Sequence, residues 1–100
     1  MDNTRNTLNN AYFALSDPTR RDILARTRGR AVSVGVLAQE YQISQPAVSR
    51  HLKVLERAGL VRKMVSGKYV YVTSDHTHTA MIQHSINSLL ADQTTETHQE

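Results

Sequence analysis

The sequence predicts a mainly α-helical fold that carries one small β-hairpin within a single domain. Apolar residues recur at spacings of three and four along most of the chain, which is the pattern of helices with one buried face. After Gly59 this spacing gives way to alternation in a run rich in valine and tyrosine, which favours strands. With 100 residues, the chain is too short to enclose two separate apolar cores.

Two helices are predicted in the first third of the chain. The first begins within a polar leader, residues 1–7. Its apolar stripe consists of Leu8, Ala11, Tyr12 and Leu15. Asp17 stands directly before Pro18, and this pair starts a second helix because Asp caps free amides and proline tolerates the first helical position. We expect this helix to continue to about Arg28 and to end at Gly29.

Two short helices separated by a tight turn are predicted at the centre of the chain. Ser33 caps the first, which continues to Tyr41. Ser44 caps the second, residues 44–58, and Pro46 lies in its first turn. Because only two residues separate Tyr41 from the Ser44 cap, the helices turn sharply against each other. This arrangement is a helix-turn-helix unit.

A hairpin and a last helix follow. Residues 60–65 and 69–73 have strand composition, and Gly67 between them accepts positive φ. Helical spacing returns from about Thr79, and we expect the folded domain to cover residues 8–91. The polar tail, residues 92–100, is expected to be disordered because it has nothing to bury.

The charge of the chain is unevenly distributed. The formal net charge is only +3, but the stretch from Arg20 to Lys68 holds eleven basic and three acidic residues, a balance of +8. The two flanks hold one basic and six acidic residues, a balance of −5. A basic centre between acidic ends suggests a face for nucleic acid, because phosphates attract clustered Lys and Arg. A merely solvated basic surface is the alternative reading.

The fourth predicted helix has one apolar face and one polar face. Val48, Leu52 and Leu55 share a narrow sector that must face the core. On the other side and near the first turn, Arg50, Gln45 and Ser49 are residue types that bond to base edges. A solvated helix face is the alternative. With phosphate-contacting residues of the helix and hairpin added, the expected DNA-binding residues are Ser44, Gln45, Ser49, Arg50, Lys53, Arg57, Arg62, Lys63 and Lys68.

Several classes of protein are excluded by composition. The absence of cysteine excludes disulfides, thiolate metal sites and thiol redox sensing. No apolar run approaches the length of a membrane span, and the first ten residues are too polar for a secretory signal, so we expect a cytoplasmic protein with no membrane partner. Ser49, His51 and Asp22 lack the nucleophile elbow or glycine-rich loop of an active site. We therefore expect no enzyme activity and no cofactor.

Three stretches together resemble the ArsR-type winged helix-turn-helix repressors. Residues 14–24 read ALSDPTRRDIL, residues 43–55 read ISQPAVSRHLKVL, and residues 58–61 read AGLV before the hairpin. The resemblance covers about residues 11–90. It implies a bacterial or archaeal homodimeric repressor with the fourth helix in the major groove of a palindromic operator and the hairpin, or wing, alongside. The runner-up is a winged helix that binds protein, whose binding would respond little to salt.

The same resemblance implies a role for the apolar stripes of the first and last helices. The first and last helices would form the dimer interface. Its expected residues are Leu8, Tyr12, Ile82, Ile86 and Leu89. Packing of these side chains on their own domain is the alternative.

Many relatives in that family release DNA when they bind a metal, but the ligand sets implied by the resemblance are missing. Thiolate sensors carry a Cys-x-Cys pair in the helix before the turn, where residues 34–39 of this chain read VGVLAQ. The last-helix set needs a histidine two residues after an aspartate, but Thr77 occupies that position after Asp75. The resemblance therefore points to the branch without metal sensing. A metal-responsive repressor remains the alternative, because His76, His78 and His84 lie close in sequence, with His98 in the tail, and imidazole binds zinc. Adding zinc to the DNA complex would separate the two.

Overall fold

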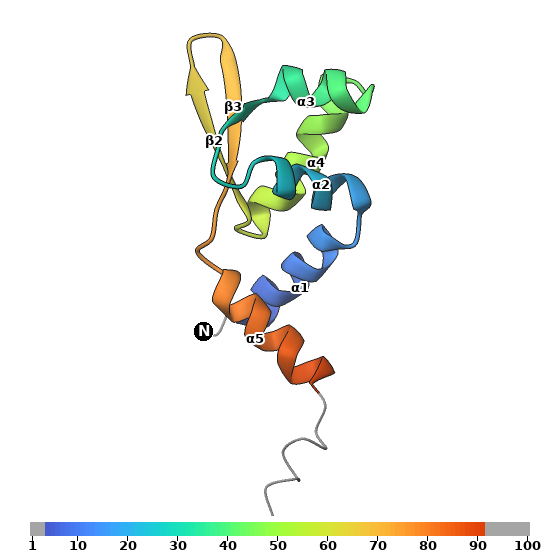
Figure 1. Cartoon of the computed structure of the whole chain (residues 1–100), viewed down its shortest axis with the longest axis vertical. Helices are drawn as coiled ribbons and strands as arrows, with labels where there is room; N and C mark the ends of the chain where they lie inside the picture. The colour runs from blue at the N-terminus through green and yellow to red at the C-terminus, as the bar shows by residue number, and fades with distance from the viewer. Residues whose placement is uncertain (1–3, 92–100) are drawn as a thin grey trace, which may run out of the picture.

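The computed structural model describes residues 4–91, in which helices and a three-stranded antiparallel sheet form the mainly helical fold that the sequence predicts (Figure 1). The predicted tail, the first three residues of the leader and His98 lie outside this range. None of the helices within it combines the length and apolar character needed to cross a bilayer. The elements are α1 (Thr4–Leu15), α2 (Pro18–Arg26), β1 (Val32–Ser33), α3 (Val34–Tyr41), α4 (Gln45–Arg57), β2 (Val61–Ser66), β3 (Tyr69–Ser74) and α5 (Thr79–Leu90).

The three predicted N-caps begin their helices. The side chains of Asp17, Ser33 and Ser44 each accept a hydrogen bond from the backbone N–H three residues later, at 3.0–3.1 Å. Each bond satisfies one of the amides that the first turn of a helix leaves unpaired. The caps therefore determine where α2, α3 and α4 begin, and they place α3 and α4 in the helix-turn-helix arrangement.

The second helix is shorter than the sequence predicts. It ends at Arg26 rather than at about Arg28, because Thr27 bonds to the sheet. The Thr27 carbonyl accepts from the Ser74 amide at 3.0 Å, and its hydroxyl bonds to the Ile23 carbonyl at 2.9 Å. Gly29 adopts the predicted left-handed conformation, with φ of +73°, in the turn beyond the helix.

The hairpin is confirmed, but it belongs to a larger sheet than predicted. Strands β2 and β3 pair so that Ser66 faces Tyr69 across a turn in which Gly67 has φ of +61°. The strand β1, which the sequence analysis missed, pairs with the other edge of β3. Because β1 leads directly into α3, this pairing holds the start of the helix-turn-helix unit against the wing.

The core lies between the helix-turn-helix unit, α2 and the inner face of the sheet. Val48, Leu52 and Leu55 of α4 are buried as predicted, and they meet Leu37 of α3 and Val72 of β3 in one cluster. The hairpin and α3 lie at one end of the molecule, whereas α1 and α5 lie together at the other (Figure 1). The predicted DNA-binding and dimer-forming residues are therefore separated along the long axis.

Candidate nucleic-acid interface

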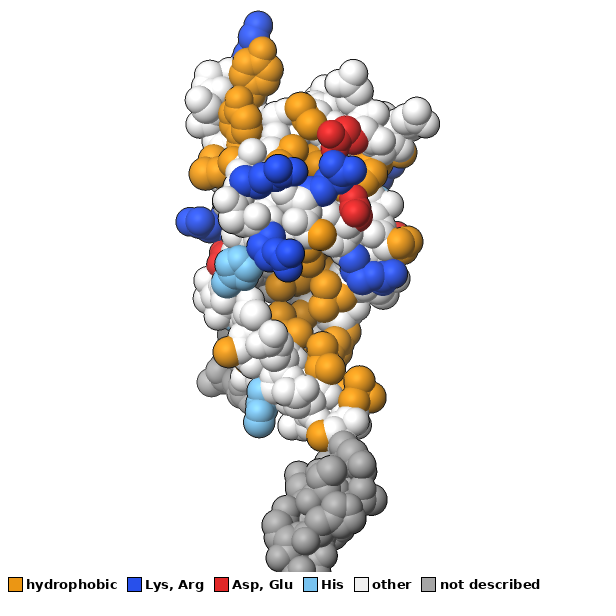
Figure 2. All heavy atoms as spheres, in the orientation of Figure 1, with side chains coloured by type: hydrophobic (Ala, Val, Ile, Leu, Met, Phe, Trp, Pro, Cys, Tyr) orange, Lys and Arg blue, Asp and Glu red, His pale blue; other side chains and the backbone are white. Residues whose placement is uncertain are grey.

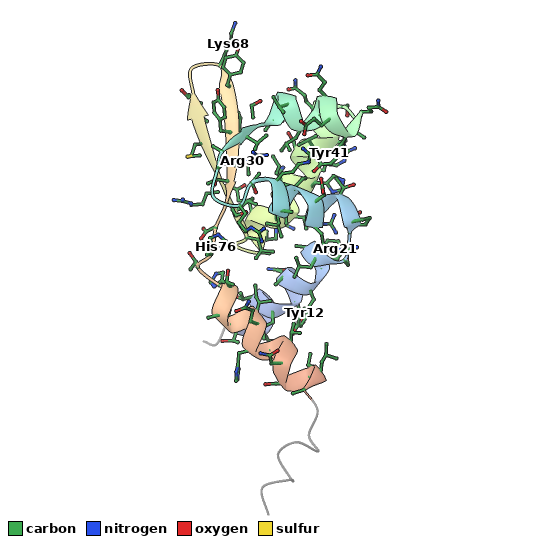
Figure 3. All side chains as sticks on the ribbon, viewed as in Figure 1. Tyr12, Arg21, Arg30, Tyr41, Lys68 and His76 are labelled. Atoms are coloured by element: carbon green, nitrogen blue, oxygen red, sulfur yellow. The ribbon has the colours of Figure 1, made fainter. Side chains whose placement is uncertain are left out.

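All nine predicted DNA-binding residues are exposed. Arg50, Lys53 and Arg57 lie on the side of α4 away from its buried face. Ser49 lies at the margin of that side, Gln45 is exposed in the first turn, and Ser44 begins the helix as its cap. Those on the hairpin lie on β2 and at the turn, where Lys68 extends beyond the tip of the wing (Figure 3). The fold thus leaves every one of these side chains accessible to a partner.

Four of the nine meet in one groove between the helix-turn-helix unit and the wing. The groove has a volume of about 590 Å³, and its walls come from the start of α3, the first half of α4 and the hairpin. Gln45 and Ser49 line it from α4, and Lys63 and Lys68 line it from the wing. The remaining predicted residues lie on exposed surface outside its lining: Ser44, Arg50, Lys53, Arg57 and Arg62.

The groove also contains residues that the sequence analysis did not select. Gly35, Val36 and Gln39 line it from α3, and Tyr69 lines it from β3. A Cβ atom at Gly35 would lie 3.6 Å from Nε2 of Gln45, so the two helices approach closely here. No local pattern identifies the α3 residues, because only the pairing of β1 with β3 brings the start of α3 beside the wing.

One of the predicted phosphate contacts already has an ionic partner. Nζ of Lys63 lies 3.3 Å from Oε1 of Glu56 on α4. Both side chains are partly exposed, and surface ion pairs of this kind contribute little to stability. The pair links the wing to α4 only weakly, so Lys63 can exchange Glu56 for a phosphate in the groove.

Arg20 is the clearest departure from the predicted basic face. Its side chain is only 8% exposed, and it bonds to the end of α1 instead of facing a partner. Nε donates to the Ala14 carbonyl at 2.8 Å and Nη2 to the Phe13 carbonyl at 3.0 Å, while the guanidinium stacks over the Phe13 ring. These contacts bring side-chain donors to carbonyls in the last turn of α1, where the Phe13 carbonyl also accepts from the Ser16 amide at 3.1 Å.

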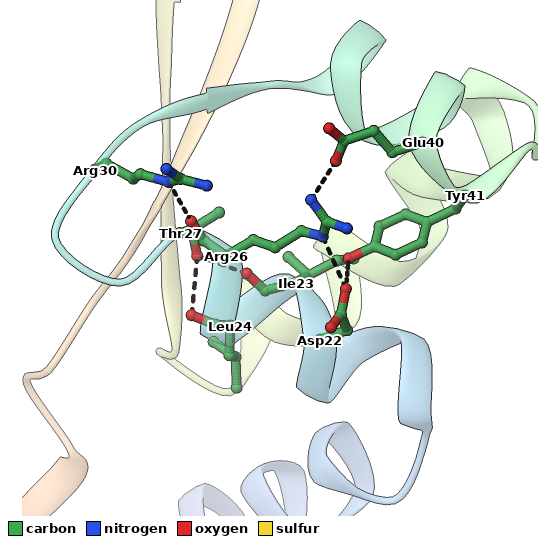
Figure 4. A network of polar contacts seen from close by, with 8 residues as sticks. All are labelled: Asp22, Ile23, Leu24, Arg26, Thr27, Arg30, Glu40 and Tyr41. Carbon is green, nitrogen blue, oxygen red and sulfur yellow. Dashed lines mark hydrogen bonds and ion pairs between the residues drawn. The ribbon is translucent and has the colours of Figure 1, made fainter.

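Arg26 is also engaged within the fold. It pairs with Asp22 at 2.9 Å and with Glu40, and it lies over the ring of Tyr41 (Figure 4). Figure 2 shows acidic side chains among the basic ones near the middle of the molecule. The balance of +8 therefore overstates the charge available to DNA, since α2 uses part of it to hold its neighbours.

The network around Asp22 joins α2 to α3. The Tyr41 hydroxyl donates to the Asp22 carboxylate, and this bond together with that from Arg26 lowers the pKa of Asp22 below its usual value. Burial and the neighbouring carboxylate raise the pKa of the Tyr41 phenol. The phenol therefore stays protonated and remains a donor across the physiological pH range.

His51 joins α4 to the start of α2. Its Nδ1 lies 3.3 Å from Nη1 of Arg20 and 3.9 Å from the Asp17 carboxylate. The backbone hydrogen bond from Arg20 lowers the pKa of Asp17, and the charges of His51 and Arg20 act in the same direction. His51 is thus part of the packing between α4 and α2 and lies away from the groove.

The three candidate metal ligands do not converge. His76 bonds to Thr79 at 3.4 Å, the ring of His78 lies against Gly59, and His84 is exposed on α5. Across the part of the chain that the structure describes, no three histidine or acidic side chains gather closely enough to hold a metal ion.

The predicted dimer residues divide into two groups. Ile82 is only 6% exposed and belongs to the core of its own chain, with Leu8 and Ile86 packed partly against that core. The Tyr12 hydroxyl bonds to Ser85, which links α1 to α5 within one chain. Leu89 remains exposed. Figure 2 shows apolar side chains continuing along this end of the molecule.

Comparison with known proteins identifies the family. A family described as "Helix-turn-helix domain" matches residues 15–63. The transcriptional repressor SdpR of Bacillus subtilis is 36% identical over 83 residues, which cover 83% of this chain and 89% of that protein.

Two solved structures show that the likeness extends to the fold. HlyU from Vibrio cholerae matches with a TM-score of 0.68 and 29% identity over 92% of this chain and 100% of that one. An ArsR-like transcriptional regulator from Rhodococcus sp. matches with a TM-score of 0.75 and 26% identity over 89% of this chain and 83% of that one. The chain belongs to the ArsR-type family of winged helix-turn-helix transcriptional regulators, which bind DNA and are not enzymes.

Proposed function

We propose that the chain is a homodimeric repressor that acts in the cytoplasm and binds a palindromic operator. The observation that carries this proposal is the groove between α4 and the wing, because polar base-reading side chains and lysines share its walls. A major groove admits an α-helix, and the exposed face of α4 presents the residue types that bond to base edges. The wing then lies along the neighbouring sugar-phosphate strand.

The residues divide into two roles. Arg50, Gln45 and Ser49 read bases, because Arg forks onto guanine, Gln onto adenine and Ser serves either. The other six hold phosphates and fix the position of the protein on the duplex. They are Ser44, Lys53, Arg57, Arg62, Lys63 and Lys68.

The dimer is formed by α1 and α5, with Leu8, Tyr12, Ile86 and Leu89 as the proposed interface residues, whereas Ile82 packs in the core of its own chain. Their end of the molecule lies opposite the wing, so pairing there leaves both DNA-binding surfaces free (Figure 1). In dimeric helix-turn-helix proteins the two recognition helices enter the major groove about 34–36 Å apart, one turn of DNA. The operator then consists of two half-sites at that spacing.

No conventional metal site takes part in this proposed function. The family's thiolate set needs cysteines, which the chain lacks, and His76 and His78 contact different parts of their own chain. We therefore place the chain in the branch that represses constitutively or responds to another signal.

Substitution of Arg50 tests the proposed function. The wild-type protein is first footprinted on the DNA upstream of its own gene, and we expect two protected half-sites related by a two-fold axis. Arg50→Ala should weaken binding to that duplex by about 1–3 kcal/mol and reduce discrimination against a half-site mutant, because a bidentate base contact is lost. Gel-shift titration of both duplexes measures the two effects.

Lys68→Ala is the matched control. It removes a phosphate contact, so it should weaken binding to all duplexes equally and make the salt dependence shallower by about 0.9 in the log–log slope. If Arg50→Ala binds the protected duplex as tightly as the wild type, the assignment of α4 as the recognition helix is wrong.

A further inference from the structure

Tyr69 is a large aromatic residue that stays mostly exposed to solvent. It is 55% exposed, although its strand contributes Val72 and Val70 to the core from the opposite face. Tyr71, on the same face as Tyr69, is half-buried, and the two rings lie 6.4 Å apart at an angle of 51°. Tyr71 thus supports one side of the Tyr69 ring, while the rest of the ring is left accessible.

The surroundings of Tyr69 combine apolar surface with positive charge. Tyr69 lines the groove next to Lys68, and Val36 of α3 lines the same groove while 43% exposed. Lys63 lines the groove from the other face of the hairpin, because it pairs with Val72. A sugar-phosphate strand has the matching chemistry, since its phosphates are anionic and its deoxyribose rings present apolar C–H surface. Phosphates alone would leave the aromatic ring and the valine exposed to water, whereas a deoxyribose can cover them.

We propose that Tyr69 contacts DNA by packing its ring on a deoxyribose of the strand that passes between α4 and the wing. The inference rests on the proposed function and extends it to a residue that carries no charge. Lys68, the neighbour of Tyr69 in the chain, holds the phosphate next to that sugar, and Tyr71 keeps the ring in place. Tyr69 therefore adds affinity that is independent of sequence and of salt.

The test compares Tyr69→Ala, Tyr69→Phe and Lys68→Ala on a fluorescein-labelled duplex of mixed sequence. Fluorescence anisotropy is recorded over a series of salt concentrations. Tyr69→Ala should weaken binding about 5- to 150-fold with an unchanged salt slope, because aromatic contacts to nucleic acid are worth about 1–3 kcal/mol and release no counterion. Tyr69→Phe should stay within about twofold of the wild type, since the ring makes the contact.

Met64→Ala is the matched control. Met64 lies on the same hairpin and is 41% exposed, but it is not part of the groove lining. Its substitution should leave DNA affinity unchanged. An equal loss in Met64→Ala and Tyr69→Ala would show that the hairpin as a whole is disturbed, and it would overturn the specific role of Tyr69.

The remaining outcomes separate this inference from the proposed function. If Lys68→Ala weakens binding and Tyr69→Ala does not, the role of Tyr69 is wrong and the DNA-binding surface stands. If neither affects binding, the DNA-binding surface itself is wrong. If polyglutamate displaces the duplex from the wild type and Tyr69→Ala loses affinity for polyglutamate alone, the groove binds an acidic peptide instead.

A measurement on the unmodified chain guards against a folding defect in the variants. Tetranitromethane nitrates exposed tyrosine rings, and mass spectrometry locates the modified residue. Tyr69 should be nitrated in the free protein and protected when the mixed-sequence duplex is bound. Equal nitration of Tyr69 with and without the duplex would contradict the proposed contact.

Discussion

The guanidinium group of Arg20 stabilises the end of α1. Two carbonyls of the last turn, those of Ala14 and Phe13, accept its N–H donors, and the Phe13 ring covers one face of the group. A buried cation is tolerated only where its donors are satisfied, as they are here. Arg20 therefore serves the fold, and its charge is not available to phosphate.

At the same scale, Asp22 makes folding sensitive to acid. Its carboxylate accepts from Tyr41 and Arg26, which lowers its pKa from the ordinary value of 3.8. A carboxyl with a lowered folded-state pKa contributes stability above its unfolded pKa and loses that stability as the pH falls through the folded value. The bridge between α2 and α3 should therefore weaken under acidic conditions.

Asp22→Asn tests this coupling. We expect the wild type to lose more unfolding free energy than Asp22→Asn between about pH 6 and about pH 3, because the variant has no carboxylate to protonate. Urea denaturation followed by circular dichroism at a series of pH values measures the difference. Tyr41→Phe removes one donor to the carboxylate and should give an intermediate dependence. Parallel pH curves for the wild type and Asp22→Asn would contradict the assigned role of the bridge.

At the scale of elements, local chemistry predicted most of the fold. The caps Asp17, Ser33 and Ser44 act through bonds to amides three residues away, so the printed sequence contains both partners. The strand β1 was missed because two residues show no alternation, and its partner Val72 lies forty positions away. The end of α2 was misplaced for the same reason, since Thr27 bonds to the distant Ser74.

The end of α4 combines a local turn with a contact to a residue far along the chain. Gly59 follows the helix with φ of +73°, and the Leu60 amide bonds back to the Leu55 carbonyl at 3.0 Å. The ring of His78, just before α5, lies so close that a Cβ at Gly59 would be 2.4 Å from its Cδ2 atom. Gly59 therefore serves both the turn and the approach of α5.

Gly59→Ala and Gly29→Ala form a matched pair that separates these two roles. Both glycines have φ of +73°, but a Cβ at Gly29 would meet nothing within 4 Å. Each substitution should cost about 1 kcal/mol for the left-handed backbone. Gly59→Ala should cost roughly 0.5–3 kcal/mol more, the range for side chains in contact.

Urea denaturation measures both costs, and the same pair is repeated in the His78→Ala background. There the extra cost of Gly59→Ala should disappear, because the ring is gone. An extra cost that persists without the His78 ring would show that the contact between Gly59 and His78 does not constrain the fold.

At the scale of the whole molecule, the sequence predicted which residues are exposed better than it predicted which of them lie together. All nine proposed DNA-binding residues are exposed, because helix periodicity separates the core face of α4 from its outer face. The groove was not predictable, since Gln39 and Tyr69 enter it only through the pairing of β1 with β3. Likewise, the apolar stripe of α5 gave no sign that Ile82 serves the core while Leu89 stays exposed.

This division within α5 gives a direct test of the proposed dimer. Leu89 is 69% exposed, so Leu89→Lys should leave the fold of one chain intact, and a cation near the C-terminus of a helix suits its dipole. In a dimer the two new charges would face an apolar interface, and sedimentation equilibrium should show dissociation at concentrations where the wild type is dimeric. Affinity for a duplex with two half-sites should fall with it, because each chain then binds alone.

Ile82→Ala is the contrasting variant, which should lower the unfolding free energy by about 2–5 kcal/mol. A Leu89→Lys protein that sediments as the wild type does would place the dimer interface elsewhere.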